Sequence, residues 1–143
     1  MQEIKILVIE DNPSDADLLL EIFDHSNDIQ VYGDYEIQYG WVKSIEEAME
    51  RLEEYKPDIV FCDLDLGETT GINTLNNVRK FLPKAPIIVT TGYLNRKLWY
   101  EALENGADDF VLKNSINPQL ILKTVFYSLA RSGSPKVQEL AKG

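Results

Sequence analysis

The side chains best suited to chemistry follow four short apolar runs of the sequence. They are the acids Glu10, Asp11, Asp63 and Asp65, the hydroxyl of Thr91 and the amine of Lys113. Three of these acids, Glu10, Asp11 and Asp63, could not all ionise at close range without compensating cations, and a divalent ion plus one lysine would cancel their charge. Oxygen ligands select Mg²⁺ or a similar hard cation. A carboxylate nucleophile, a metal, a lysine and a hydroxyl are also the groups that phosphoryl transfer requires.

The apolar pattern predicts a scaffold that would bring these residues together. Short β-branched runs alternate with stretches of helical period five times along the chain. Strands are expected at 4–9, 36–42, 59–62, 87–90 and 110–112, each followed by a helix. Such alternation predicts an α/β fold, a three-layer, doubly wound parallel sheet of (βα)5 type. With the strand order 2-1-3-4-5, the acids after the first and third strands would meet at the crevice where strand order reverses.

Local signals place the helix ends. Asn12-Pro13 and Asn117-Pro118 each join a capping amide to a proline suited to the first helical turn. Gly106 is expected to close the fourth helix in a left-handed conformation. Asp108-Asp109, just before the fifth strand, is expected to form a solvated turn.

Length and composition limit the class of protein. The chain has 143 residues, and we expect one domain over 1–131 with a frayed C-terminal tail at 132–143. With 14 Lys and Arg against 24 Asp and Glu, the net charge of −10 disfavours direct binding to nucleic acid or an anionic membrane. One cysteine excludes an intrachain disulfide framework. No apolar run approaches the roughly 20 residues of a membrane span, so we expect a cytoplasmic protein.

The motifs carry a family resemblance when taken together. They are residues 8–12, residues 57–66, Gly71, Thr91-Gly92 and residues 106–113. In this order they resemble the response-regulator receiver domain, the phosphoacceptor half of two-component signalling, which has a flavodoxin-like fold of the chemotaxis-regulator type. The resemblance spans residues 4 to about 131.

The resemblance implies the chemistry of the site. Asp63 would accept a phosphoryl group from the phosphohistidine of a histidine kinase or from a phosphotransfer protein. Glu10 and Asp11 would hold Mg²⁺ together with Asp63, and the backbone carbonyl of Asp65 would be a further ligand. The protein would catalyse only its own phosphoryl transfer and dephosphorylation, so it would not be an enzyme in the ordinary sense.

The resemblance also implies a switch. Thr91 and Lys113 would contact the phosphoryl oxygens, so Thr91 and its loop are expected to move inward on phosphorylation. Phe110 would then fill the vacated space, while Asp65 and Tyr93 would tune the phosphoryl lifetime. A downstream protein would bind the face made by the fourth helix, the fifth strand and the fifth helix. Homodimerisation is left open.

Three positions depart from the family pattern. Gly67 stands where a proline is usual, which should loosen the loop after Asp63. Asn114 stands where a cis proline commonly follows the lysine, and a cis bond without proline would cost about 3 kcal/mol. Lys113 would therefore be aimed differently or through a strained bond. Phe110 lacks the hydroxyl of a tyrosine.

The sequence leaves two other functions open. One is a receiver-like interaction module that is never phosphorylated, which only Gly67 and Asn114 favour. The other is a haloacid-dehalogenase-type phosphatase, which would also use an aspartyl phosphate and Mg²⁺. Against it, the Asp-x-Asp motif of that family lies on the first strand, whereas Asp63-Leu64-Asp65 follows the third.

Overall fold

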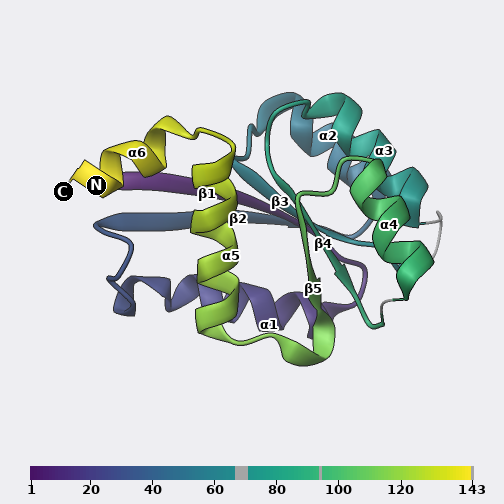
Figure 1. Ribbon diagram of the computed structural model, residues 1–143, viewed down its shortest axis with the longest axis horizontal. Helices are drawn as coiled ribbons and strands as arrows, with labels where there is room; N and C mark the ends of the chain where they lie inside the picture. Colours follow the sequence, from purple (N-terminus) through teal and green to yellow (C-terminus); the bar gives the residue numbers. More distant parts are fainter. Residues whose placement is uncertain (67–70, 94, 143) are drawn as a thin grey trace.

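Five parallel strands form a single sheet at the centre of the molecule (Figure 1). The computed structural model describes residues 1–66, 71–93 and 95–142, so the prediction for Gly67 lies outside the described residues. The strand order is β2-β1-β3-β4-β5, which confirms the predicted order and fold class. The strands are β1 Gln2–Ile9, β2 Tyr35–Val42, β3 Ile59–Asp63, β4 Ile87–Thr91 and β5 Asp109–Leu112.

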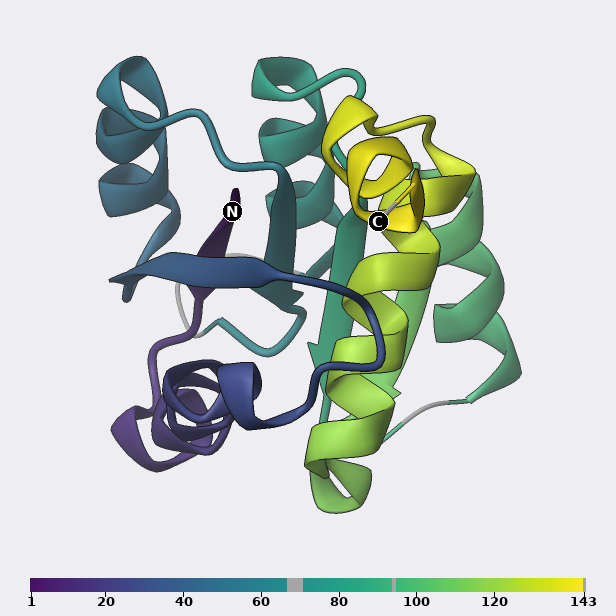
Figure 2. The same cartoon turned by 90° about the vertical axis from the view of Figure 1, so that its left-hand side faces the viewer.

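Helices cover both faces of the sheet and complete the three layers (Figures 1 and 2). α1 and α5 pack against one face, and α2, α3 and α4 pack against the other. Their bounds are α1 Pro13–Asp24, α2 Ile45–Glu54, α3 Gly71–Phe81, α4 Arg96–Glu104 and α5 Pro118–Arg131. Two 3₁₀ turns, η1 Ser26–Asp28 and η2 Lys113–Ser115, follow α1 and β5.

The nearly unbroken apolar sequence of β1 follows from this double cover. Successive side chains of a strand point to opposite faces of the sheet. Ile4 and Ile6 belong to the core under α1 and α5, whereas Leu7 and Ile9 belong to the core under α2 and α3. All four are fully buried, and each contributes roughly 1.5–3 kcal/mol. β1 is therefore a rigid base for the acids that follow it.

The structure confirms the helix ends that were predicted from Asn12, Asn117 and Gly106. Asn12 Oδ1 accepts hydrogen bonds from the backbone N–H groups of Ser14 and Asp15 at the start of α1. Asn117 caps α5 in a similar way. Gly106 has a φ of +98°, in the left-handed region that favours glycine. Because Asn12 starts α1 directly after the first acid pair, the first turn of α1 lies at the carboxyl edge of the sheet.

The C-terminal residues form a helix, so the predicted frayed tail is wrong. α6, Pro135–Lys142, lies beside the start of β1, where the two termini are close together (Figure 1). Val137 and Leu140 pack against the core, and Lys136 pairs with Asp58 at 2.8 Å. This apolar pair at helical spacing explains why the segment folds back. The division of the chain at residue 131 stays a prediction.

A charged network holds the amino edge of the sheet. Arg79 in α3 donates from Nη1 to the carbonyls of Leu82 and Ala85, at 3.0 and 2.8 Å. Its Nη2 donates to the carbonyl of Gly106 and to the carboxylate of Asp108. Asp108 is exposed, as predicted, although the ion pair from α3 holds it in place. The predicted turn is wrong at Asp109, because this residue begins β5.

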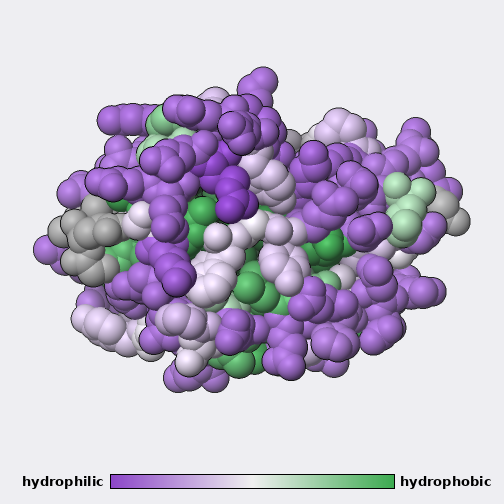
Figure 3. Space-filling model, turned by 180° about the vertical axis from the view of Figure 1, so that it is seen from behind, coloured by the Kyte–Doolittle hydropathy of each residue, from purple (hydrophilic) through white to green (hydrophobic). Residues whose placement is uncertain are grey.

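The molecular surface on the β2 side is largely polar. Hydrophilic residues cover most of the face shown in Figure 3, and hydrophobic residues form small patches near its middle. Within the ranges that the structure describes, none of the helices has both the length and the hydropathy that crossing a bilayer requires.

Candidate functional site

Three carboxylates from two neighbouring strands meet at the carboxyl edge of the sheet. β1 and β3 are paired, with Ile9 opposite Cys62. Glu10 and Asp11 follow β1, and Asp63 ends β3, so the pairing brings the acids together. One carboxylate oxygen from each lies within 4.8 Å of the others. The predicted meeting of these acids is confirmed, and we call the three residues the acid cluster.

Burial separates this cluster from ordinary surface acids. Asp63 and Glu10 are only 1% and 3% exposed, while Asp11 faces solvent. Asp63 Oδ1 accepts the backbone N–H of Asp65 at 2.8 Å. Asp63 Oδ2 is buried and has no hydrogen-bond partner within the described part of the chain. Because a buried polar atom without a partner costs about 1–3 kcal/mol, this oxygen indicates a place for a proton, a cation or a covalent group.

The acid cluster fits a hard divalent cation. All three side-chain ligands are carboxylate oxygens, which suit Mg²⁺ better than softer metals. The exposure of Asp11 keeps one side of the cluster open to solvent. Such a site leaves room for water or a phosphate oxygen beside the ion.

Lys113 supplies the positive charge of the site. Its Nζ lies 3.0 Å from Glu10 and 3.2 Å from Asp63. A further carboxylate, that of Asp15 in α1, lies 3.0 Å away. Although burial opposes the charge, the hydrogen bonds to Asp15 and Glu10 raise the pKa of Lys113 above its ordinary value. The bond between Lys113 and Asn114 is trans, so the lysine reaches Asp63 without a strained cis bond.

Glu10 has a strongly altered acidity. Its own burial and the adjacent carboxylate of Asp63 raise the pKa of Glu10 to about 8, although the hydrogen bond from Lys113 acts in the opposite direction. Burial and the neighbouring Asp63 thus favour the protonated form of this carboxyl group in the metal-free protein. The N–H of Asn12 donates to Glu10 Oε2 at 3.2 Å, and the indole of Trp41 donates to the Glu10 carbonyl at 2.8 Å. These two bonds fix the orientation of Glu10.

Thr91 is bonded to the loop that follows β4. Its buried hydroxyl donates to the carbonyl of Tyr93 at 2.8 Å and lies 3.4 Å from Asp65 Oδ2. The same oxygen of Asp65 accepts the N–H of Gly92 at 3.2 Å. The side chain of Tyr93 is exposed. The side-chain carboxylate of Asp65 is thus hydrogen-bonded to the loop after β4. This contact is compatible with the predicted metal ligand, because that ligand is the backbone carbonyl of Asp65 and not its side chain.

Phe110 lies at the surface of β5 with 37% of its area exposed. It borders a groove of about 210 Å³ that Trp99 and Leu103 of α4 also line. Both of these side chains are exposed as well. The face expected to bind a downstream protein therefore presents large apolar side chains, while its binding role stays a prediction.

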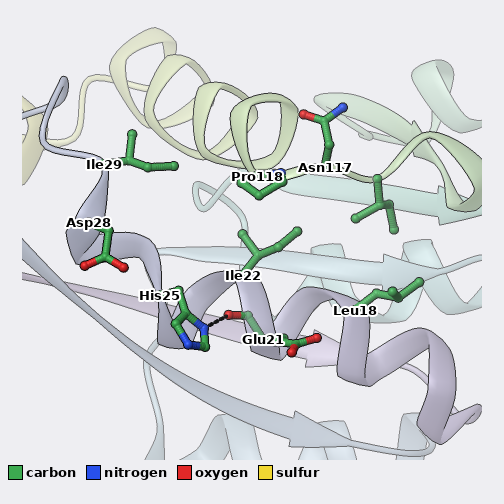
Figure 4. Close-up of a pocket in the computed structure, with 9 residues that line it drawn as sticks. Leu18, Glu21, Ile22, His25, Asp28, Ile29, Asn117 and Pro118 are labelled. Carbon is green, nitrogen blue, oxygen red and sulfur yellow. Dashed lines mark hydrogen bonds between the residues drawn. The ribbon is translucent and has the colours of Figure 1, made fainter.

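A second hollow lies between α1 and the start of α5 (Figure 4). It has a volume of about 470 Å³, and its apolar walls are formed by Leu18, Ile22, Ile29, Ile116 and Pro118. His25 lies at its rim, with Nδ1 2.9 Å from the carbonyl oxygen of Glu21. No member of the acid cluster lines this hollow, so the hollow is separate from the place where phosphoryl chemistry would occur.

Sequence reasoning missed two residues of the site, Asp15 and Trp41. A signal for Asp15 existed, because a helix that starts at Pro13 places its first turn at the edge where the acids collect. Trp41 lies opposite Val8 in the pairing of β2 with β1. That register becomes known only when the strands are paired, so the contact with the Glu10 carbonyl had no sequence signal.

The sequence and the fold together define the family. The family model described as the response regulator receiver domain matches residues 6–126. The chain belongs to this family, and it is a signalling domain of two-component systems rather than a classical enzyme. The alternative of a haloacid-dehalogenase-type phosphatase is therefore wrong.

Individual relatives agree with this family. The response regulator protein VraR of Staphylococcus saprophyticus is 29% identical over 112 residues, which are 78% of this chain and 50% of that protein. The transcriptional regulatory protein ZraR of Klebsiella oxytoca is 36% identical over 67 residues, 47% of this chain and 15% of that protein. The chain thus spans about half the length of the VraR proteins that it matches.

Solved structures show the same fold. A two-component response regulator from Clostridium difficile aligns with a TM-score of 0.78 and 22% identity, covering 92% of this chain and 99% of that one. A CheY-like receiver domain protein from Methanospirillum hungatei JF-1 aligns with a TM-score of 0.75 and 21% identity, covering 92% and 97%.

Proposed function

We propose that the protein is a phosphorylation-dependent switch whose acceptor is Asp63. A histidine kinase or a phosphotransfer protein would donate the phosphoryl group. The acid cluster would hold Mg²⁺, with the backbone carbonyl of Asp65 as a further ligand. The observation that carries the proposal is the buried Oδ2 of Asp63, which lacks a partner among the described residues beside two other carboxylates. A carboxylate with a purely structural role would have both oxygens satisfied.

The proposed transfer forms one bond and breaks one bond. A carboxylate oxygen of Asp63 attacks the phosphorus of the phosphohistidine, the P–N bond breaks, and its electron pair stays on the imidazole nitrogen. Mg²⁺, when bound, supplies neutralisation of the charge on the phosphoryl oxygens. Lys113, whose Nζ lies 3.2 Å from Asp63, would pair with the same oxygens. Attack of water on the phosphorus would later break the bond between the phosphorus and the Asp63 oxygen, release inorganic phosphate and restore the carboxylate, which is the proposed self-dephosphorylation.

The switch follows from the added charge. Phosphorylation changes the charge at Asp63 from −1 to about −2 and adds acceptor oxygens. The hydroxyl of Thr91 would then leave the carbonyl of Tyr93 and donate to a phosphoryl oxygen. This movement would draw the loop after β4 inward, and Phe110 would turn from the surface into the vacated space. Asp65 and Tyr93, which contact this loop, would set the phosphoryl lifetime.

The proposed setting is the cytoplasm, with a kinase or phosphotransfer protein upstream. Downstream, a protein or a second copy of the chain would bind the face made by α4, β5 and α5. We expect no membrane contact and no direct contact of these 143 residues with nucleic acid, because their net charge is −10. This expectation is limited to the present chain, since one relative is named a transcriptional regulatory protein.

Acetyl phosphate labelling tests the acceptor. With Mg²⁺, the unmodified protein should gain one phosphoryl group by intact mass, and Asp63→Asn should gain none while keeping its circular dichroism spectrum. Asp17→Asn, an exposed acid of α1, is the matched control and should be labelled normally. Persistent labelling of Asp63→Asn would move the acceptor elsewhere. A folded, unmodified protein that stays unlabelled would favour the interaction module that is never phosphorylated.

A further inference from the structure

We infer that Asp15 is a positioning residue that holds Lys113 over the acceptor carboxylate of Asp63. The inference rests on the proposed function, since it assigns to Asp15 a part in the same phosphoryl chemistry. Asp15 lies outside the acid cluster, and its inferred role is to position Lys113 and not to bind the metal.

The three N–H donors of Lys113 have three carboxylate acceptors. Its Nζ lies 3.0 Å from Glu10, 3.0 Å from Asp15 and 3.2 Å from Asp63. An ammonium group has three donors and no acceptor, so these contacts match its capacity. The Lys113 side chain is only 15% exposed, and its position is therefore set by these three acids.

Asp15 differs from the other two acceptors because it takes no direct part in the proposed metal binding or phosphoryl transfer. A bound cation would draw on Glu10, and phosphorylation would convert the carboxylate of Asp63 into an acyl phosphate. Asp15 belongs to neither event, because the described residues that converge as metal ligands are those of the acid cluster alone. Of the three acceptors, Asp15 is therefore the one that keeps its contact with Lys113 whether or not the cation and the phosphoryl group are present.

The helix fixes Asp15 independently of the lysine. Asp15 is the third residue of α1, and its N–H donates to the capping oxygen of Asn12 at 3.2 Å. A negative charge in the first turn of a helix is favoured by the exposed N–H groups there. The carboxylate is therefore anchored from α1, on the chain segment that also carries the acid cluster.

The backbone around Lys113 constrains the position of this lysine less than α1 constrains the position of Asp15. β5 ends at Leu112, so Lys113 lies beyond the hydrogen-bonded ladder and begins the short turn η2. The residues after it, Asn114 and Ser115, are exposed. An ion pair from a helix 98 residues away in sequence thus supplies the constraint that this backbone does not.

A double-mutant cycle with beryllofluoride tests this role in the Mg²⁺-loaded protein. Asp15→Asn should raise the dissociation constant of beryllofluoride by about three- to tenfold, the loss expected for one partly exposed charge-assisted hydrogen bond. In the Lys113→Met background the same substitution should have no effect. Asp17→Asn, which removes the same charge from the same helix, should bind like the unmodified protein.

Two results of that cycle would overturn the inference. A dissociation constant that is unchanged or lower in Asp15→Asn would exclude a positioning role. A loss of equal size in the Lys113→Met background would mean that Asp15 acts through the general field and not through the lysine.

A second measurement needs neither metal nor phosphoryl mimic. In protein labelled with ¹³C at lysine Cε, the Lys113 signal, identified by its absence in Lys113→Met, should report a lower order parameter in Asp15→Asn and no change in Asp17→Asn. Unchanged order would overturn the inference. The unmodified protein could fail to bind beryllofluoride while Asp15→Asn still lowers the order parameter of Lys113. In that case the proposed function fails and the positioning role stands.

Discussion

At the carboxyl edge of the sheet a single lysine, Lys113, faces three carboxylates, whereas at the amino edge Arg79 faces one. Arg79 also donates to three backbone carbonyls, and its partner Asp108 accepts the N–H of Ile87 at 2.8 Å. Charge and hydrogen bonds at the amino edge are therefore balanced within the chain. At the carboxyl edge the acids outnumber the cation, and one buried oxygen of Asp63 lacks a partner among the described residues.

This difference separates a structural network from a ligand site. A polar network that serves stability satisfies each member, because any unpaired buried group is costly. A site that binds a charged ligand keeps negative charge and an unsatisfied acceptor that the ligand completes. Both edges pair one basic side chain with acidic side chains at the ends of the same sheet, so charge balance is the feature that distinguishes them.

Substitution at the amino edge should give the largest loss of stability. Arg79→Met would leave the carbonyls of Leu82, Ala85 and Gly106 without this donor. The carboxylate of Asp108 would lose its cationic partner and keep the N–H of Ile87. The free energy of unfolding in urea should fall by about 2–3 kcal/mol. Arg96→Met, an exposed arginine of α4, should have almost no effect. If Arg79→Met kept full stability, or if its folded form could no longer be labelled by acetyl phosphate, the contrast between the two edges would be lost.

A smaller effect is expected from pH at the carboxyl edge. The pKa of Glu10 is raised from 4.5 to about 8 in the folded protein, so the folded state binds the extra proton. In EDTA, the contribution of Glu10 to stability should be fully present below pH 4.5 and should be lost as pH rises to about 8. Glu10→Gln, which cannot ionise, should lack this component. Identical pH profiles of the two proteins in urea unfolding would contradict the assigned burial of Glu10.

The acid cluster should respond to loss of one ligand through affinity and not through stability. Asp11→Asn should weaken Mg²⁺ binding about tenfold, since affinity for a hard cation follows the number of charged ligands. Trp41 is a suitable fluorescent reporter because its indole contacts Glu10, and Trp99→Phe removes the second tryptophan. Asp17→Asn should bind Mg²⁺ normally. A marked loss of stability in EDTA, with Mg²⁺ affinity unchanged, would mean that Asp11 stabilises the fold and does not bind the metal.

The smallest effect is expected at α6. Lys136→Met removes the pair with Asp58 and should cost about 0.5–1 kcal/mol, because both side chains are partly exposed. Lys142→Met removes a more exposed pair with Glu139 at 3.8 Å and should cost close to nothing. Equal thermal unfolding curves for the two variants would show that α6 contributes through its apolar contacts alone.

The fold and the acid cluster could be predicted because the determining signals are local. The apolar run of β1 predicts a strand covered on both faces, and Asn12-Pro13 predicts the start of α1. Once the strand order is assumed, the carboxyl ends of β1 and β3 bring Glu10 and Asp63 together without further information.

The remaining features depend on contacts between distant segments. Arg79 reaches Asp108 across 29 residues, and Asp15 reaches Lys113 across 98. No spacing in the sequence marks either pair, because each arises from the packing of a helix beside a strand end. The helix at 135–142 was missed for a related reason, since its two apolar residues gain burial only against the completed core.

Binding of beryllofluoride to the unmodified protein, with and without Mg²⁺, tests the proposed switch most directly. We predict binding only when Mg²⁺ is present, together with NMR shifts at Thr91 and Phe110 and little change around Arg79. Binding of equal strength in EDTA, or Mg²⁺-dependent binding that leaves Thr91 and Phe110 unshifted, would contradict the proposal.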